Sequence, residues 1–163
     1  MFVTISIMVK VLLICTSVHH GNTRKIAEAM AEAVGGETCT PLEMYPRLID
    51  KYEVIGLGSG IYFGKHHKSL FKLLDKVCLK NKKVFIFYTS GISRIPFLNG
   101  CEDALRRALI VRGARILGIF GCRGYCDHGL FKLVEGINRG RPNEEDLDRA
   151  RAFIFKTLGL KPK

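Results

Sequence analysis

The stretch Ser17-Val18-His19-His20-Gly21-Asn22-Thr23 decides the fold, because it joins two segments with different hydrophobic patterns. Before it, residues 9–15 form a nearly continuous apolar run, typical of a parallel strand buried on both faces. After it, residues 23–34 carry apolar side chains at helical spacing, and Gly35-Gly36 ends that helix. The stretch is therefore predicted to be a turn from the end of a strand into the start of a helix.

The same alternation of strand and helix continues along the chain. Further strands are predicted at residues 37–40, 52–58, 83–88 and 115–120, and further helices at 67–79, 101–111 and 144–157. We expect a loop through Pro41 and Pro46, and a helix start at Pro142-Asn143-Glu144-Glu145. Five buried strands with helical crossovers predict an α/β fold, an open five-stranded parallel sheet with helices on both faces in a three-layer sandwich.

Length and composition predict a single domain. The chain has 163 residues, of which 47% are apolar and 25% charged, and this is ordinary globular composition. We expect residues 1–8 to be a short extension, with Met8 as an alternative start, and residues 9–163 to form the domain. No basic region precedes the apolar residues 2–7, and no apolar run reaches the roughly 18 residues of a spanning helix. We therefore expect a cytoplasmic protein, without membrane association and with reduced cysteines.

The formal net charge of +11 leaves three kinds of partner or surface open. They are nucleic acid, an acidic protein partner, and a basic surface that is only solvated. Nucleic acid is disfavoured because the basic residues are scattered, and the denser clusters at 80–83 and 139–141 lack interleaved aromatic residues. A basic docking face for an acidic redox partner protein fits the charge at least as well.

In an open parallel sheet the ligand lies beyond the carboxyl ends of the strands, so the strand-end loops 16–23, 58–65, 89–97 and 121–129 are the candidate site. The first loop has the most specific pattern. Gly21 allows close approach of the backbone, and the start of a helix attracts an anion. We expect Asn22 and Thr23 to cap the helix and donate to phosphate, with Ser17 in support. The alternative is a capped turn without a ligand.

These loops resemble those of the flavodoxin family. Ser17-x-x-x-Gly21-Asn22-Thr23 after an apolar strand is similar to the flavodoxin phosphate signature, and residues 58–64 (Gly-Ser-Gly-Ile-Tyr-Phe-Gly) are similar to a flavin-binding loop. The resemblance implies a flavodoxin-like fold and non-covalently bound FMN. It also implies electron transfer between redox partner proteins through flavin semiquinone and hydroquinone. The implied cofactor-binding residues are Ser17, Val18, His19, His20, Gly21, Asn22, Thr23, Ser59, Gly60, Ile61, Tyr62, Phe63, Thr89, Ser90, Gly91, Cys122, Arg123, Gly124 and Tyr125.

The chain departs from the family pattern at two points. Val18, His19 and His20 stand where hydroxyl residues usually precede the glycine, and one more residue separates that glycine from Ser17. The sequence also has no Trp. An aromatic lid on the flavin ring must therefore come from Tyr62, Phe63 or Tyr125.

Other functions of similar folds lack their required residues. A tyrosine phosphatase needs Cys-x5-Arg in the first loop, but Gly21 stands six residues after Cys15. A receiver domain needs paired acidic residues after its first strand, and a dinucleotide-binding domain needs Gly-x-Gly-x-x-Gly at the first turn. Neither pattern is present there. One enzyme alternative stays open, a flavodoxin-like FMN oxidoreductase of the quinone or protoporphyrinogen type, with residues 121–141 as the only candidate for a substrate-shaping insert.

We predict no catalytic side chain and no metal site. The five histidines, His19, His20, His66, His67 and His128, include two adjacent pairs, and neighbouring side chains do not easily ligate one ion. We expect His19 or His20 to be an N–H donor near the phosphate. We expect His66 and His67 to be solvated residues at a helix start, and Cys122 to pack rather than react.

Overall fold

The computed structural model describes residues 9–91 and 100–161. The strands are β1 (Val11–Thr16), β2 (Glu37–Cys39), β3 (Val54–Tyr62), β4 (Lys65–His66), β5 (Lys83–Ser90) and β6 (Arg115–Arg123). The helices are α1 (Asn22–Val34), α2 (Pro46–Ile49), α3 (Lys68–Leu74), α4 (Gly100–Val111) and α5 (Glu144–Leu158), with a 3₁₀ helix, η2, at Gly129–Val134. The predicted extension at 1–8 and residues 92–97 of the third predicted loop lie outside the described residues.

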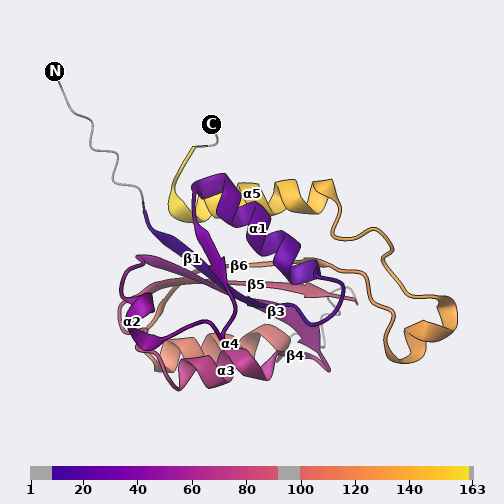
Figure 1. Cartoon of the computed structure of the whole chain (residues 1–163), viewed down its shortest axis with the longest axis horizontal. Helices are drawn as coiled ribbons and strands as arrows, with labels where there is room; N and C mark the ends of the chain where they lie inside the picture. The colour runs from indigo at the N-terminus through magenta and orange to yellow at the C-terminus, as the bar shows by residue number, and fades with distance from the viewer. Residues whose placement is uncertain (1–8, 92–99, 162–163) are drawn as a thin grey trace.

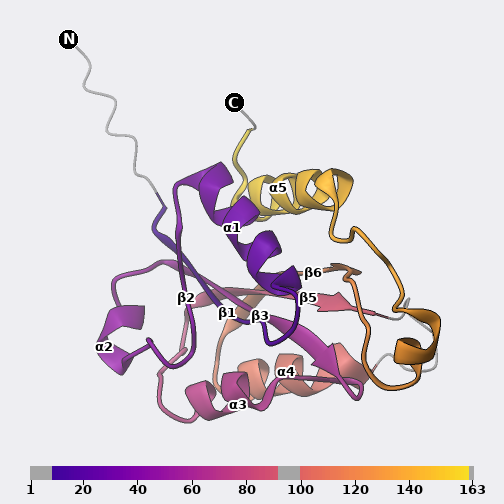
Figure 2. The same cartoon turned by 45° about the vertical axis from the view of Figure 1, so that its right-hand side comes forward.

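The main sheet is parallel, with strand order β2-β1-β3-β5-β6, and β4 pairs antiparallel with the end of β3. Helices α1 and α5 cover one face, and α3 and α4 cover the other (Figures 1 and 2). The predicted α/β fold, with five parallel strands in a three-layer sandwich, is confirmed. No helix in the described ranges is both long and apolar enough to cross a bilayer.

Alternating side chains of the central strands fill two separate cores. On the α3–α4 face, Leu12 and Ile14 of β1 pack with apolar residues of β3 and β5. On the α1–α5 face, Leu13 and Cys15 pack with Phe85, Phe87 and the helix residue Ile26. Burial on both faces explains why the strands are continuously apolar in the sequence.

The strands run further toward the candidate site than predicted. Ser59 pairs with Thr16 on one side and Tyr88 on the other, and Gly60 pairs with Thr89. The parallel pairing ends at Gly60, and Ile61 and Tyr62 extend β3 by pairing with His66 and Lys65 of β4 across a tight turn. The predicted loop 58–65 is therefore a strand end followed by a β-hairpin. Likewise Thr89, Ser90, Cys122 and Arg123 belong to strands rather than loops, because β5 and β6 stay paired to their last residues.

Two short helices were not predicted. Helix α2 begins at Pro46 within the expected loop, since the missing N–H of proline costs nothing at a first helical position. The segment between β6 and α5 contains η2. The start of α5 is confirmed: Asn143 and Asp146 form a capping box, and three acidic residues occupy the first turn.

Two glycines of β3 are required by the aromatic core. A Cβ on Gly56 or Gly58 would overlap the ring of Phe85 or Phe87, respectively, on the neighbouring strand. Both rings are fully buried. The central strand therefore has no room for a side chain on this face at those two positions.

We expect Gly58→Ala to lower the free energy of unfolding by about 1–3 kcal/mol, because the added methyl group must displace the Phe87 ring. The measurement is urea unfolding. Phe87→Leu should relieve the overlap, so the double variant should be less destabilised than the sum of the two single losses. Additive losses would show that the overlap is not the cause.

Candidate functional site

The loop between β1 and α1 turns through two consecutive left-handed residues. His20 has φ 55° and Gly21 has φ 66°, and α1 begins immediately afterwards at Asn22. Within residues 9–91 and 100–161, no side chain caps this end of the helix. The first N–H groups of α1 therefore lack the usual capping acceptor and are available to an anion. The expectation that Asn22 or Thr23 caps the helix is wrong.

Asn22 and Thr23 instead tie the loop to its neighbours. The Asn22 amide donates to the carbonyl oxygen of Tyr125 at 2.8 Å, and the hydroxyls of Thr23 and Thr89 are 2.8 Å apart. Both side chains are buried. A Cβ on Gly124 would lie 2.7 Å from the Asn22 amide nitrogen, so glycine is needed there for this close approach.

Tyr62 lies against the first loop from the hairpin side. Its hydroxyl accepts a hydrogen bond from the Val18 N–H at 3.3 Å. Its ring makes edge contacts with His19 and His67, at centroid distances of 6.0 and 5.6 Å. Partial burial raises the pKa of Tyr62, which keeps the phenol protonated. Of the three aromatic residues considered as a lid, Tyr62 and Tyr125 contact the predicted phosphate loop, whereas Phe63 is exposed.

The Ser59 side chain is hydrogen-bonded to His66 of β4 rather than to the first loop. Its hydroxyl is 3.0 Å from His66 Nδ1 and accepts the His67 N–H at 2.9 Å. His66 is only 3% exposed, and burial lowers its pKa from 6.5 to about 4. Its Nε2 has no hydrogen-bond partner among the described residues. The expectation of a solvated His66 is therefore wrong, because β4 folds it inward against Tyr88.

His67 is half-buried and has a structural role. Its ring accepts a hydrogen bond from the Ser69 N–H at 3.2 Å, which caps α3. The Ser69 hydroxyl is also 2.6 Å from that of Thr16 at the end of β1. This capping was not predicted, although the position of His67 at the start of α3 agrees with the expectation.

The segment from Gly124 to Asn143 folds back on itself beyond the strand ends, and we call it the β6–α5 segment (Figure 1). An antiparallel bridge joins Cys126 and Ile137. The Asn138 amide donates to the carbonyl oxygens of Gly91, at 2.6 Å, and Gly124, at 3.2 Å. Sequence reasoning missed Asn138, because an isolated Asn in a glycine-rich segment looks like an ordinary turn residue.

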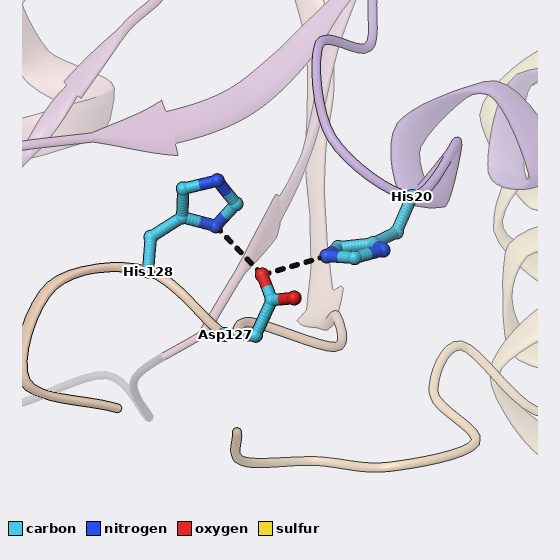
Figure 3. Close-up of side chains that lie close together, drawn as sticks. All are labelled: His20, Asp127 and His128. Carbon is cyan, nitrogen blue, oxygen red and sulfur yellow. Dashed lines mark hydrogen bonds and ion pairs between the residues drawn. The ribbon is translucent and has the colours of Figure 1, made fainter. Parts of the chain in front are cut away.

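Asp127 of this segment joins two histidines. Its Oδ1 is 2.8 Å from His20 Nε2 and 2.8 Å from His128 Nδ1 (Figure 3). The hydrogen bond from His20 holds the pKa of the Asp127 carboxyl below its usual value. The His19 ring stacks on His128 at 3.8 Å. Desolvation, and then repulsion by His128 and His20, lowers the pKa of His19.

This cluster was not predicted, because only histidines adjacent in the sequence were considered as ligands of a shared ion. The dipeptide Asp127-His128 was its one signal in the sequence, and only the fold shows that it meets the first loop.

The structure brings together part of the predicted set. Residues of the first loop contact Tyr62, Thr89, Gly124 and Tyr125, whose ring lies 4.6 Å from that of His20. Cys122 points into the α1–α5 core, where burial raises its pKa to about 12, so it packs as expected. Phe63 is fully exposed at the hairpin tip. The remaining members, Ser17, Gly60, Ile61, Ser90, Gly91 and Arg123, lie at the ends of β1, β3, β5 and β6.

Comparison with known proteins identifies the family. The sequence profile described as "Flavodoxin domain" matches residues 13–113. The chain belongs to the flavodoxin domain family. An uncharacterized protein of Methanocaldococcus jannaschii is 46% identical to this chain over 150 residues. The aligned residues cover 91% of this chain and 98% of that protein.

Solved flavodoxins have the same fold as this protein. Oxidised flavodoxin 2 from Bacillus cereus has a TM-score of 0.68 at 19% identity, covering 92% of this chain and 98% of that one. A flavodoxin from the domain Archaea has a TM-score of 0.67 at 14% identity, covering 92% and 96%. The predicted family and fold are therefore confirmed.

The buried His66 predicts a pH-dependent stability. An unfolded chain takes up a proton on this residue near pH 6.5, whereas the folded protein takes it up only near pH 4. The unfolded state therefore binds more protons between these values, so stability falls as pH decreases through them. The loss should approach about 3 kcal/mol at pH 4 and below. Urea unfolding curves between pH 4 and pH 7 would measure it.

His66→Asn should remove most of this pH dependence, because the amide keeps a polar atom near Ser59 and has no titrating ring. His67→Asn is the matched control, since Asn also caps helices well, and it should retain the dependence. Equal slopes in the two variants would contradict the assignment to His66.

Proposed function

We propose that the protein is an FMN-binding electron carrier of the flavodoxin type. The observation that carries this proposal is the uncapped start of α1 behind the left-handed His20-Gly21 turn. This turn follows β1, next to the ends of β3 and β5. Membership of the flavodoxin domain family supports the same assignment.

The residues of the first loop fit a phosphate group. A Cβ on Gly21 would meet no described residue within 4 Å, which supports open space beside the turn. The N–H groups of the first helical turn point toward the helix start, where the dipole favours negative charge. The Thr23 hydroxyl adds a donor in the same turn when it accepts its hydrogen bond from Thr89 and so keeps its own proton for the phosphate. Asn22 would act indirectly, by fixing the loop to Tyr125.

The flavin ring would be held by the β3–β4 hairpin. Tyr62 offers an aromatic face, and its bond to Val18 N–H links that face to the phosphate loop. When bound, FMN supplies the electron-transfer chemistry, and the protein supplies binding, orientation and electrostatics.

We propose that the physiological partners are redox proteins with an acidic docking surface. The net charge of +11 supports this proposal, because complementary charge speeds the encounter of carrier proteins. Rapid electron exchange that slows strongly with added salt would support it. Exchange that is insensitive to salt would argue for a neutral partner surface.

A second candidate function is an FMN oxidoreductase acting on a quinone or protoporphyrinogen. One observation favours it: the β6–α5 segment is folded back and held to Gly91, and it exposes Leu133 and Val134. Such exposed apolar side chains suit an apolar substrate. Steady-state turnover of a quinone with a reductant separates the candidates, because an electron carrier alone should show little catalytic turnover.

The first test is the absorption spectrum of the purified protein. We expect the blue and near-ultraviolet bands of flavin, with the cofactor released on denaturation. A colourless protein that also fails to bind added FMN would contradict the proposal.

Thr23→Ala tests the phosphate contact. Removing a hydrogen bond to a charged group costs about 1.5–3 kcal/mol, so we expect FMN affinity to fall by roughly 10- to 150-fold. Riboflavin, which has no phosphate, should lose little affinity. Titrations that follow flavin fluorescence measure both ligands.

Thr89→Val is the matched control, because it removes the hydroxyl that contacts Thr23 but leaves Thr23 itself in the loop. The ratio of FMN to riboflavin affinity should stay near the wild-type value in this control. Equal losses for the two ligands in Thr23→Ala would contradict the assignment of this loop to phosphate.

A further inference from the structure

The cluster of His20, Asp127 and His128 has the composition of a transition-metal site. We propose that these three side chains bind one divalent ion of the zinc type, at the junction of the first loop and the β6–α5 segment. The proposed electron-carrier function does not require such an ion. Two imidazoles and one carboxylate are ligands that zinc accepts in proteins.

The three ligand atoms converge on a small volume. His20 Nε2 and His128 Nδ1 each lie 2.8 Å from Asp127 Oδ1, and all three atoms lie within 4.8 Å of one another. Zinc binds nitrogen and oxygen at about 2.0–2.2 Å, which places tetrahedral ligand atoms about 3.4 Å apart. Each distance to Asp127 must therefore widen by about 0.6 Å. Side-chain rotation can supply this shift, since the three side chains are 33–47% exposed.

The two hydrogen bonds to Asp127 join the same three atoms that an ion would bind. Both rings turn a nitrogen toward the same carboxylate oxygen (Figure 3). In the ion-free cluster, each of these nitrogens must carry a proton to donate. A divalent ion would take the place of these two protons: each moves to the other nitrogen of its ring, or to solvent if that nitrogen is already protonated, which leaves neutral imidazoles and an ionised carboxylate as the ligands.

Neighbouring rings hold two of the ligands in place. The Tyr125 ring lies 4.6 Å from that of His20, and the His19 ring lies 3.8 Å from that of His128. Such contacts exclude large ring rotations but leave room for the small shift that an ion requires, so less ordering is needed when an ion binds. The exposed side of the cluster leaves a fourth position for water. This open position is typical of zinc sites with three protein ligands.

An ion at this position would join parts of the chain that are far apart in the sequence. His20 precedes the left-handed Gly21, whereas Asp127 lies in the β6–α5 segment. Binding only to the folded state raises its thermal stability. We therefore expect Zn²⁺ to raise the melting temperature.

The test uses the full, tag-free chain, stripped of metal and titrated with Co²⁺ as a spectroscopic substitute for Zn²⁺. We expect visible absorption bands that saturate at one ion per chain and disappear when Zn²⁺ is added. Because Cys126 is adjacent to the cluster, the near-ultraviolet spectrum is also recorded. A strong sulfur-to-cobalt charge-transfer band would overturn the proposed ligand set.

Asp127→Asn and His128→Gln should each weaken Co²⁺ binding at least about tenfold and abolish the rise in melting temperature with Zn²⁺. His67→Gln is the matched control, because it changes a histidine outside the cluster, and it should bind as the wild type does. Circular dichroism would check that the variants fold. Wild-type binding that does not saturate at one ion, or equal losses in His67→Gln, would overturn the proposal.

The titration is done with and without added FMN. Because all three proposed ligands are protein side chains and FMN supplies none, the cobalt bands should appear in both cases. A protein that fails to bind FMN but still binds Co²⁺ would contradict the proposed function alone.

Discussion

The parallel pairing of β1, β3, β5 and β6 is the constraint on which the rest of the structure depends. It brings the carboxyl ends of these strands to one edge of the sheet. The first loop, the β3–β4 hairpin and the β6–α5 segment all start from that edge, so they must share a small region of space. The aromatic core fixes this arrangement, because Gly56 and Gly58 admit the rings of β5 against the central strand.

Local sequence patterns predicted most of the strands and helices and the position of the first loop, because residues close together in the sequence mark each of them. The apolar run of β1, the helical spacing of α1 and the glycine between them could all be read from the sequence. The ends of the strands could not. Ser59 and Gly60 are polar or small and look like loop residues, but pairing on both sides keeps them in the sheet. Pairing partners come from distant parts of the chain, so composition alone does not reveal them.

At the candidate site, the position of the first loop between a strand and a helix could be read from the sequence, but the contacts between segments could not. Asn22 looked like a helix cap, yet its amide reaches Tyr125, which lies more than a hundred residues further along the chain. His66 looked solvated beside His67, yet two residues of antiparallel pairing were enough to bury it. Asp127 was not considered at all. Each of these side chains has a partner that only the tertiary fold supplies.

The uncapped start of α1 connects the two proposals physically. An anion at the first helical turn would satisfy N–H groups that no side chain caps. A divalent ion held by two neutral imidazoles and one carboxylate would leave a net charge of about +1 beside that anion. Opposite charges at neighbouring sites favour each other's binding, and the coupling is reciprocal. The replacement of hydroxyl residues by His19 and His20 before Gly21 therefore need not weaken an anion site. With an ion bound, part of the positive field at the anion would come from the adjacent cluster rather than from direct hydrogen-bond donors.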